Sequence, residues 1–193
     1  MSPSLPLPGD DQLPEEIRSA LGRLPPLNVF RMVAGVPASF RPFLELGGSL
    51  LGGTQIDPKN REIAILGVAK QTGAGYEWAQ HEQLARNVGV SEDEIEAIRG
   101  DEPASGLDGD GALAFRAATE ISRDVRISDE ALGLLVERWG EAGAAELTLC
   151  VSYYNMVSRF LESTGVEIEP EQLLGSRAGD RRRNPQPPER GCG

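Results

Sequence analysis

Apolar residues recur along this chain at the three- and four-residue spacing of amphipathic helices, and glycines and prolines mark where the helices end. The pattern first predicts helices from Leu27 to Ala34 and from Ser39 to Leu51, separated by Gly35-Val36-Pro37. Asp57-Pro58 then supplies an N-cap followed by proline at the first helical position, where the missing N–H costs nothing. A helix from Pro58 to about Gln71 follows.

The next predicted helix covers residues 76–88 and carries one apolar stripe with a polar pair on it. Its members stand three or four positions apart and therefore share a face: Glu77, His81, Leu84, Ala85 and Val88. The break before this helix is Gly73-Ala74-Gly75, and Gly89 ends it as a C-cap.

A capping box and three further helices complete the pattern. Ser91-Glu92-Asp93-Glu94 opens a short helix in which Ile95 and Ile98 face inward. After a loop from Asp101 to Gly111, three helices are predicted, at Ala112–Asp124, Ser128–Trp139 and Ala142–Leu161. Strand signals are nearly absent, so the predicted fold class is all-α.

The helices are predicted to form one domain over residues 15–174. Residues 1–14 and 175–193 lack periodicity, which indicates a flexible N-terminal segment and a disordered, locally basic C-terminal tail outside the core. The stretches 87–95 and 124–132 resemble each other, and each runs into a Ser-capped helix. Either an internal duplication of helical units or a shared capping pattern accounts for that likeness.

Composition and charge restrict the class of protein. With 39% hydrophobic and only 5% aromatic residues, 193 residues are enough for one aliphatic, helical core. A net charge of −11 argues against nucleic acid or an anionic membrane as partner, because like charges repel. The start shows no signal-peptide pattern and no stretch is apolar enough to span a bilayer, so we expect a cytoplasmic protein.

Cysteine and histidine are scarce, which limits the chemistry. The two cysteines are Cys150, inside a helical pattern, and Cys192 near the end, and they form no Cys-x-x-Cys pair. A four-thiolate zinc site is excluded, and Cys150 is interpreted as a small apolar filler. One histidine with two glutamates is a conceivable open metal site, but we expect no metal ion and no other cofactor, because a second histidine is missing.

His81 is the only histidine in the chain, and Glu77 stands four residues before it. On a helix this spacing places both side chains on one face, roughly 5–6 Å apart at Cβ, where the carboxylate orients the imidazole. The alternative is an ordinary helix-surface contact. Glu62 lies on the preceding predicted helix, and a hairpin through 73–75 would bring it toward His81; a structural role near the helix N-terminus is its alternative.

Four motifs stand in a fixed order along residues 27–165: Asp57-Pro58 leading to Arg61-Glu62, Tyr76-Glu77-Trp78-Ala79-Gln80-His81, Ala85-Arg86-Asn87-Val88-Gly89-Val90-Ser91, and Tyr154-Asn155-Met156-Val157-Ser158-Arg159-Phe160. Together they resemble the carboxymuconolactone decarboxylase family of the alkylhydroperoxidase-D-like superfamily. The resemblance implies an all-helical bundle that assembles into a homo-trimer or homo-hexamer, with a dimer as a further state. Alanine-rich helices such as Ala112–Asp124 can pack closely against a second copy.

The chain departs from the peroxidase branch of that superfamily, in which a Cys-x-x-Cys pair precedes the histidine at the positions of Ala74 and Glu77. Peroxide reduction in that branch needs one thiolate to attack the O–O bond and a second thiol to resolve the product. Both thiols are missing here, so alkylhydroperoxidase-type antioxidant activity is not expected.

By resemblance to the decarboxylase branch, His81, Glu77 and Glu62 are the candidate catalytic residues of a cofactor-independent lyase that acts on a carboxy-lactone or a related carboxylic acid. In that interpretation His81 donates a proton, Glu77 holds its tautomer and raises its pKa, and Glu62 binds the substrate or serves as a second acid. Two alternatives stay open: an isomerase or ring-opening enzyme on the same scaffold, and a non-catalytic oligomeric protein that binds a small molecule.

Five further residues are candidates for binding the substrate: Tyr76, Trp78, Tyr154, Asn155 and Arg159. Tyr76 and Trp78 flank the acid–base pair, with core packing as the alternative. Arg159, with Asn155 one turn before it, is placed either to clamp a carboxylate or to form a structural or intersubunit ion pair.

Overall fold

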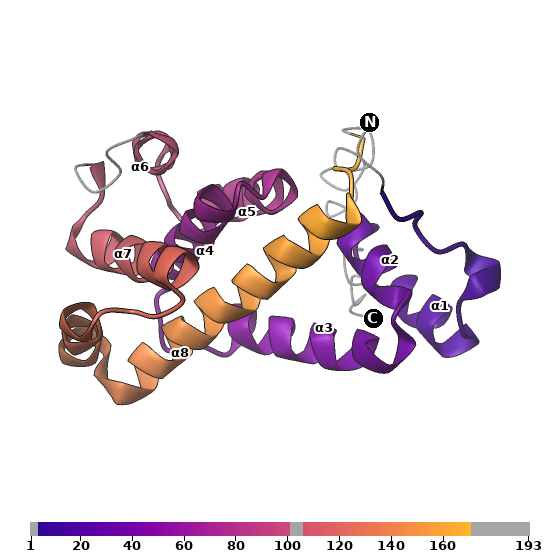
Figure 1. Cartoon of the computed structure of the whole chain (residues 1–193), viewed down its shortest axis with the longest axis horizontal. Coiled ribbons are helices and arrows are strands. Elements are labelled where there is room, and N and C mark those ends of the chain that lie inside the picture. Colours follow the sequence, from indigo (N-terminus) through magenta and orange to yellow (C-terminus); the bar gives the residue numbers. More distant parts are fainter. Residues whose placement is uncertain (1–3, 101–105, 171–193) are drawn as a thin grey trace, which may run out of the picture.

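The structure, a computed structural model, describes residues 4–100 and 106–170. The described part consists of helices without any strand, which confirms the all-α bundle (Figure 1). One 3-10 helix and eight α-helices follow one another: η1 (Asp10–Gln12), α1 (Glu15–Leu21), α2 (Asn28–Ala34), α3 (Pro37–Gly52), α4 (Pro58–Thr72), α5 (Gly75–Asn87), α6 (Glu92–Arg99), α7 (Gly109–Asp124) and α8 (Asp129–Thr164).

Helix α4 is the centre of the molecule, and every residue from Asn60 to Ala69 is buried. From Ile63 to Ala69 its residues are apolar on all sides, as expected for a helix that is covered all round. Helices α5, α6, α7 and α8 pack against it (Figure 1). Gly67 allows α7 to approach closely, because a Cβ at this position would lie 3.0 Å from Ala118 Cβ.

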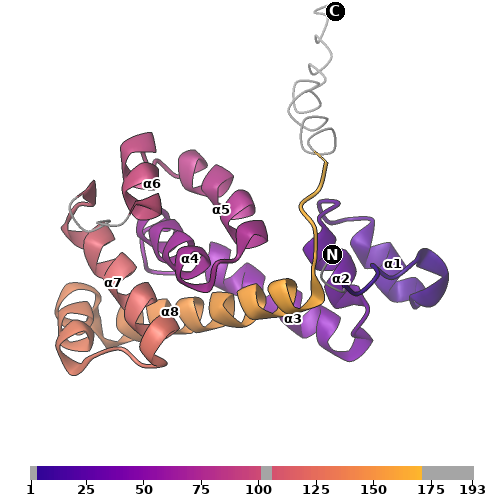
Figure 2. The same cartoon turned by 45° about the horizontal axis from the view of Figure 1, so that its top comes forward.

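Helix α8 links the two ends of the molecule (Figures 1 and 2). The sequence predicts separate helices at Ser128–Trp139 and Ala142–Leu161, and the structure confirms the break between them, because the backbone of Gly140 within α8 is not helical. The φ of Gly140 is 71°, a left-handed conformation that glycine adopts without strain. Beyond the kink, α8 passes along the body formed by α4 to α7 and reaches α2 and α3 (Figure 2).

The N-terminal residues form a smaller hydrophobic cluster around α1 to α3. Helix α1, which the sequence analysis did not predict, contributes Ile17, and Leu13 is buried beside it. Leu5 N also donates a hydrogen bond of 2.9 Å to Thr164 O at the end of α8. The expectation that residues 1–14 lie outside the core is therefore wrong for Leu13, which stands one helical turn before Ile17 and packs in the same cluster.

Local caps decide where the later helices begin. Ser91 and Ser128 accept backbone hydrogen bonds as the N-caps of α6 and α8, as the sequence predicts. Helix α7 begins at Gly109 and not at Ala112, because the Asp108 side chain caps it three residues earlier. The two similar stretches thus share a serine cap at the start of a helix.

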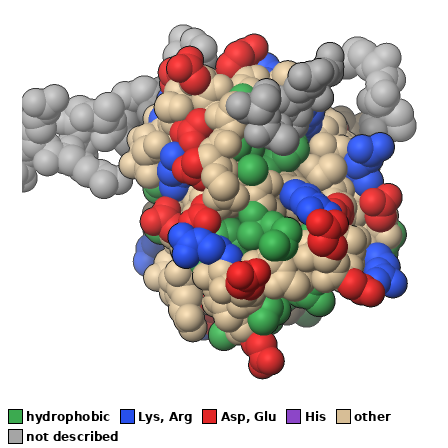
Figure 3. Space-filling view, turned by 90° about the vertical axis from the view of Figure 1, so that its left-hand side faces the viewer, with side chains coloured by type: hydrophobic (Ala, Val, Ile, Leu, Met, Phe, Trp, Pro, Cys, Tyr) green, Lys and Arg blue, Asp and Glu red, His purple; other side chains and the backbone are tan. Residues whose placement is uncertain are grey.

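The exposed side chains at the end of the molecule near α6 and α7 are a mixture of acidic, basic and small hydrophobic groups (Figure 3). Among the described residues, no helix combines enough length with enough apolar character to cross a bilayer. The predicted disordered tail, residues 175–193, lies outside the described residues.

Candidate active site

Glu62 is positioned by the start of α4. The Asp57 side chain accepts a hydrogen bond of 2.8 Å from Lys59 N and caps this helix. Glu62 follows about one turn later and is only 1% exposed. A carboxylate buried to this extent is strongly destabilised unless it is hydrogen-bonded, so its partners indicate its role.

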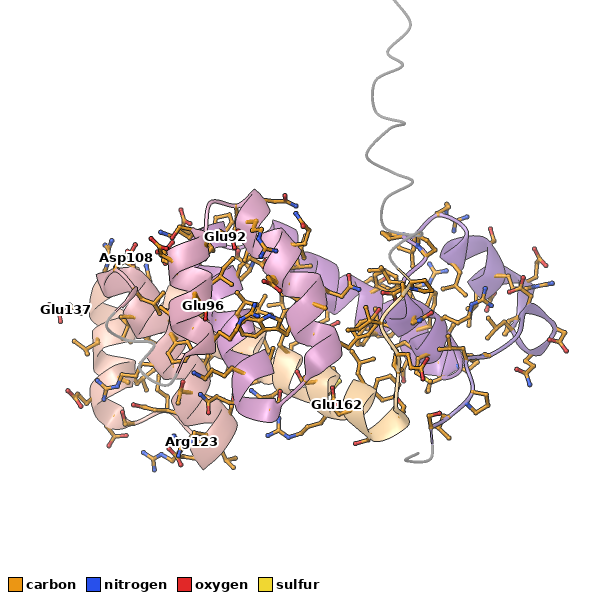
Figure 4. All side chains as sticks on the ribbon, turned by 90° about the horizontal axis from the view of Figure 1, so that it is seen from above. Glu92, Glu96, Asp108, Arg123, Glu137 and Glu162 are labelled. Atoms are coloured by element: carbon orange, nitrogen blue, oxygen red, sulfur yellow. The ribbon has the colours of Figure 1, made fainter. Side chains whose placement is uncertain are left out.

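A tight turn places His81 opposite Glu62. Gly73 adopts a left-handed φ of 68°, which ends α4 and lets the chain reverse into α5. Glu162 of α8 then accepts a hydrogen bond of 3.1 Å from Gly75 N and holds the first turn of α5 (Figure 4). The hairpin that the sequence suggested is therefore present, and α8 braces it.

His81 lies between two glutamates. Its Nδ1 is 2.7 Å from Glu62 Oε2, and its Nε2 is 3.2 Å from Glu77 Oε1, one turn earlier on α5. All three residues are buried. The structure thus brings together the three candidate catalytic residues, and the shorter contact is the one that spans two helices.

The surroundings of His81 favour its protonated form. Burial by itself would lower the pKa of the imidazole, but the carboxylates of Glu62 and Glu77 outweigh burial and raise this pKa to about 9. The imidazolium with two carboxylates is a compact, buried acid–base cluster. It holds a proton at neutral pH and can exchange it with a group that reaches the ring.

Two tyrosines of α8 form a wall beside this cluster. The Tyr154 ring meets the His81 ring edge-on at 4.7 Å between centroids, and Tyr153 meets Tyr154 edge-on at 5.3 Å. Burial raises the pKa of both phenols well above their usual value, so both are neutral. Tyr153 is further held by donating a hydrogen bond of 3.2 Å to Phe43 O of α3.

Tyr76 points away from the ring of His81. Its hydroxyl donates to Glu169 Oε1 at 2.5 Å and accepts a hydrogen bond of 3.2 Å from Val29 N. Glu169 also accepts a hydrogen bond of 2.7 Å from Gln80 Nε2. Tyr76 therefore ties α5 to α2 and to the segment that follows α8.

Trp78 also lies apart from the cluster. Its Nε1 donates to Glu82 Oε2 at 3.0 Å, and the guanidinium of Arg99 stacks over its ring at 5.0 Å. The ring packs against the apolar side chains between α4, α5 and α6. In the described chain, Trp78 thus connects α5 to α6.

Asn155 and Arg159 contact α7 and not α5. Asn155 Nδ2 donates to Ser122 Oγ at 2.9 Å, and Arg159 donates to the Asn155 side chain and to Ser122 O. These contacts join α8 to the C-terminal turn of α7. Of the five candidate binding residues, only Tyr154 touches His81.

The apolar stripe of α5 is narrower than predicted. Glu77, His81 and Ala85, each four residues apart, are buried against the body. Leu84 is 40% exposed and Val88 is half-buried, so the predicted place of Leu84 on the buried face is wrong. Residues four apart shift gradually around a helix of 3.6 residues per turn, so the buried stripe does not run straight along α5. It passes through Ala85 and not through Leu84.

Sequence reasoning assigned no role in the site to Arg61, Tyr153 or Cys150. Arg61 Nε lies 3.5 Å from Glu62 Oε1. Cys150 is buried one turn before Tyr154, where burial raises the pKa of its thiol to about 12. The adjacency of Arg61 to Glu62 is visible in the sequence, and the motif that begins at Tyr154 indicates α8. No local signal assigns Tyr153 or Cys150 to the surroundings of His81.

Two surface grooves lie away from this cluster. One of about 370 Å³ lies beside α1 and α2, and another of about 610 Å³ lies between the starts of α4 and α7 and the first part of α8. Neither is lined by Glu62, Glu77 or His81. We place the site at the buried cluster because the titratable groups that face one another are there, whereas the charged groups of the grooves are mostly paired at the surface.

Metal-ligating side chains do not gather in the described residues: no group of three or more His, Cys, Asp or Glu is arranged to hold an ion. Both nitrogens of His81 face carboxylates at contact distance.

Residues 37–120, from the start of α3 to late in α7, match the carboxymuconolactone decarboxylase family. This stretch contains Glu62, Glu77 and His81. No curated protein matches the sequence significantly.

Solved structures share the fold over nearly the whole chain. A peroxidase-related protein from Silicibacter sp. TM1040, described as uncharacterized, is similar with a TM-score of 0.76 at 18% identity, covering 89% of this chain and 94% of that one. The alkylhydroperoxidase AhpD core of a similarly described protein from Ralstonia eutropha JMP134 gives 0.74 at 17%, covering 88% and 93%. A variant of the debrominase Bmp8 in complex with 2,3,4-tribromopyrrole gives 0.65 at 17%, covering 91% and 98%. At these identities the likeness concerns the fold.

Proposed function

We propose that this chain, whose residues 37–120 match the carboxymuconolactone decarboxylase family, is a cofactor-independent small-molecule lyase. Its substrate is a carboxy-lactone or a related carboxylic acid, and His81 with its two glutamates provides acid–base catalysis. The observation that carries this proposal is the position of His81, buried between Glu62 at 2.7 Å and Glu77 at 3.2 Å. A histidine held in this way is an oriented proton donor.

The two ring nitrogens have different tasks. Glu62 makes the shorter contact, at Nδ1, and fixes the plane of the ring. Nε2 makes the longer contact with Glu77, so it is the nitrogen that exchanges its proton with the substrate. Glu77 then returns a proton to Nε2 from solvent, which completes the cycle.

The chemical step is loss of carbon dioxide followed by protonation. The bond between the carboxylate and the ring carbon breaks, and its electron pair moves into the conjugated carbonyl to give a dienolate. His81 Nε2–H then protonates carbon, and the reaction consumes one proton from solvent for each carbon dioxide released. The neighbouring imidazolium offsets the negative charge that develops on the dienolate oxygen.

The surroundings of the cluster suit this step. Tyr153 and Tyr154 present aromatic rings and neutral phenols, so the wall beside His81 adds no charge. In such surroundings the charged carboxylate is less well solvated than in water, and its loss as neutral carbon dioxide is favoured. Since the catalytic side chains are buried, substrate entry requires the surrounding helices to open.

Thiol chemistry has little support in this chain. Ala74 and Glu77 occupy the two positions at which the peroxidase branch has cysteines. Cys150 is buried, and burial raises the pKa of its thiol to about 12, so almost no nucleophilic thiolate forms at neutral pH. Cys192 lies outside the described residues.

Two alternatives use the same cluster. An isomerase or ring-opening enzyme would need the same proton donor and would release no carbon dioxide. A non-catalytic ligand-binding protein would tolerate replacement of His81. The debrominase complex adds that a protein with this fold accepts a small planar ring, which agrees with either an enzyme or a binding protein.

The test compares wild type with His81→Ala, Glu77→Gln and Glu62→Gln on a panel of carboxy-lactones and β-keto acids. Carbon dioxide release and product mass are followed, with a thiol-dependent peroxide assay alongside. Glu96→Gln, on the exposed face of α6, is the matched control for loss of a carboxylate. The proposal is supported if wild type and Glu96→Gln turn over a substrate and His81→Ala does not. Products of unchanged mass indicate an isomerase, and activity that survives His81→Ala contradicts the assigned site.

We also propose that the protein self-associates as a homo-trimer or homo-hexamer. The outer face of α8 supports this, because Leu149 and Met156 on it are 49% and 46% exposed. Apolar side chains of this size gain free energy when a second copy covers them. Light scattering after size exclusion gives the mass directly; a monomer at micromolar concentration contradicts the proposal.

A further inference from the structure

Arg61 is a buried cation beside the acid–base cluster. Its side chain is 8% exposed, and no other arginine among the described residues is buried. A guanidinium in such a position is costly unless its charge and its five N–H groups have partners. The partners of Arg61 therefore indicate whether its charge is satisfied within the chain.

The side chain of Arg61 makes only two hydrogen bonds within the described residues, and both are long. Nε donates to Glu62 Oε1 at 3.5 Å, and Nη1 donates to Thr54 Oγ1 at 3.3 Å. Nη2 has no hydrogen-bond partner in the described part of the chain, and it is not fully enclosed, so a group from outside can reach it. The carboxylate nearest to Arg61 is held more closely by another group, since Glu62 lies 2.7 Å from His81.

Two surface arginines of the same chain, Arg138 and Arg116, are better paired. Arg138 binds both oxygens of Asp110 at 2.6 Å, and Arg116 contacts two glutamates at 2.7 and 2.8 Å. Burial should increase the need for close partners, yet the contacts of the buried Arg61 are longer than those of these two surface arginines. This reversal points to a partner that the chain itself does not supply.

We propose that Arg61 binds a carboxylate of the substrate, at a subsite next to the Glu62–His81 pair. This rests on the proposed function, which requires an organic acid at this site. The planar guanidinium matches a carboxylate bidentately through Nη1 and Nη2, which is a geometry that a lysine does not reproduce.

The carboxylate bound by Arg61 is one that the product retains. An ion pair to the departing carboxylate would stabilise the charged ground state and slow the loss of carbon dioxide. An ion pair to a second carboxylate orients the substrate without that penalty. The structure therefore favours substrates that carry an acid group besides the one that leaves.

Benzoate is the probe for this subsite, with benzamide as its neutral counterpart, and calorimetric titration of the full-length protein gives the Kd. Wild type should bind benzoate more tightly than benzamide. Arg61→Gln should weaken benzoate roughly tenfold or more and abolish the preference, because a charge-assisted pair is lost. Arg138→Gln, which removes a paired surface cation, should leave benzoate binding unchanged.

Arg61→Lys keeps the buried charge but loses the planar fork, so it covers the case in which Arg61→Gln does not fold. Weaker benzoate binding by a folded Arg61→Lys supports the proposal. Equal benzoate binding by wild type and either folded Arg61 variant overturns it, and so does a wild type that does not prefer benzoate to benzamide.

Failure of the proposed function gives a different result. If wild type releases no carbon dioxide from any substrate, but Arg61→Gln still loses the preference for benzoate over benzamide, the carboxylate subsite stands without the lyase. If His81-dependent carbon dioxide release is present and Arg61→Gln keeps the preference, the lyase stands and the role of Arg61 is wrong.

Discussion

Glu62 Oε2 lies 2.7 Å from His81 Nδ1, although the two residues are 19 positions apart and belong to different helices. Glu77, which shares a helix with His81, makes the longer contact of 3.2 Å. The residue that best orients the imidazole is therefore supplied by the hairpin fold. Any movement of α4 against α5 acts directly on the orientation of His81.

The two glutamates should contribute unequally to the pKa of His81. Glu62→Gln and Glu77→Gln should each lower the pKa from about 9, and Glu62→Gln should lower it more, because its carboxylate is closer. An NMR titration of the imidazole measures this without ambiguity, since the chain has a single histidine. Glu82→Gln, which removes a carboxylate that pairs with arginines, is the control. A larger effect from Glu77→Gln would reverse the assigned roles.

The raised pKa of His81 should make stability depend on pH. The pKa rises from 6.5 to about 9 on folding, so the stabilisation from the bound proton is complete below about pH 6.5 and is lost as the pH rises through 9. It amounts to roughly 3 kcal/mol at most, for a shift of this size. Urea unfolding at pH 6 and pH 9.5 should show a larger loss for wild type than for His81→Gln. Equal losses in both proteins would show that His81 does not carry this effect.

Asn155 should matter for stability and not for chemistry. Asn155→Ala removes the link to Ser122 of α7 and leaves Arg159 without its side-chain acceptor, so we expect a loss of about 1–2 kcal/mol. Carbon dioxide release by the folded variant should stay close to wild type. Ser152→Ala, on the exposed face of α8, is the control and should change the free energy of unfolding little. A stable Asn155→Ala variant without activity would return this residue to the site.

Much of the fold could be predicted because caps and breaks are local signals. Asp57-Pro58 and Ser91 start their helices where the sequence places them, since each cap needs only its own side chain and a nearby N–H. The break at Gly140 between the two predicted helices is a local signal of the same kind, and the structure has it at that residue. Packing of α1 and Leu13 could not be predicted, because it depends on the distant helices α2 and α3.

The residues of the candidate site also fall into those that a local sequence pattern predicts and those that it does not. Glu77 and His81 follow from helical spacing, and Glu62 follows from the hairpin once the turn at Gly73 is recognised. Asn155 and Arg159 stand close to Tyr154 in sequence, but they lie on another face of α8 and contact α7. No local sequence pattern predicts which face of a helix packs against which neighbouring helix. Their separation from His81 therefore required the three-dimensional structure.

Cys150 should be unreactive in the folded protein. It is 2% exposed, and burial raises the pKa of its thiol to about 12, so both access and thiolate are lacking. In a Cys192→Ser background, Cys150 should react with Ellman's reagent only as fast as the protein unfolds, and fully in urea. A fast reaction under native conditions would show that α8 opens beside the cluster and would reopen the case for thiol chemistry.

Gly67 should be indispensable for the contact between α4 and α7. A Cβ there would lie 3.0 Å from Ala118 Cβ and 3.1 Å from Phe115 Cδ2, so Gly67→Ala should force the helices apart and cost about 1–3 kcal/mol. Gly133→Ala is the matched control, because the exposed Gly133 on α8 has open space around its Cβ position and alanine favours the helix there by about 0.5–1 kcal/mol. Opposite changes in the free energy of unfolding, measured in urea, are expected for the two variants. Stabilisation by both would mean that α4 and α7 pack less closely than the structure shows; because α4 carries Glu62, that result would also weaken the assigned geometry of the site.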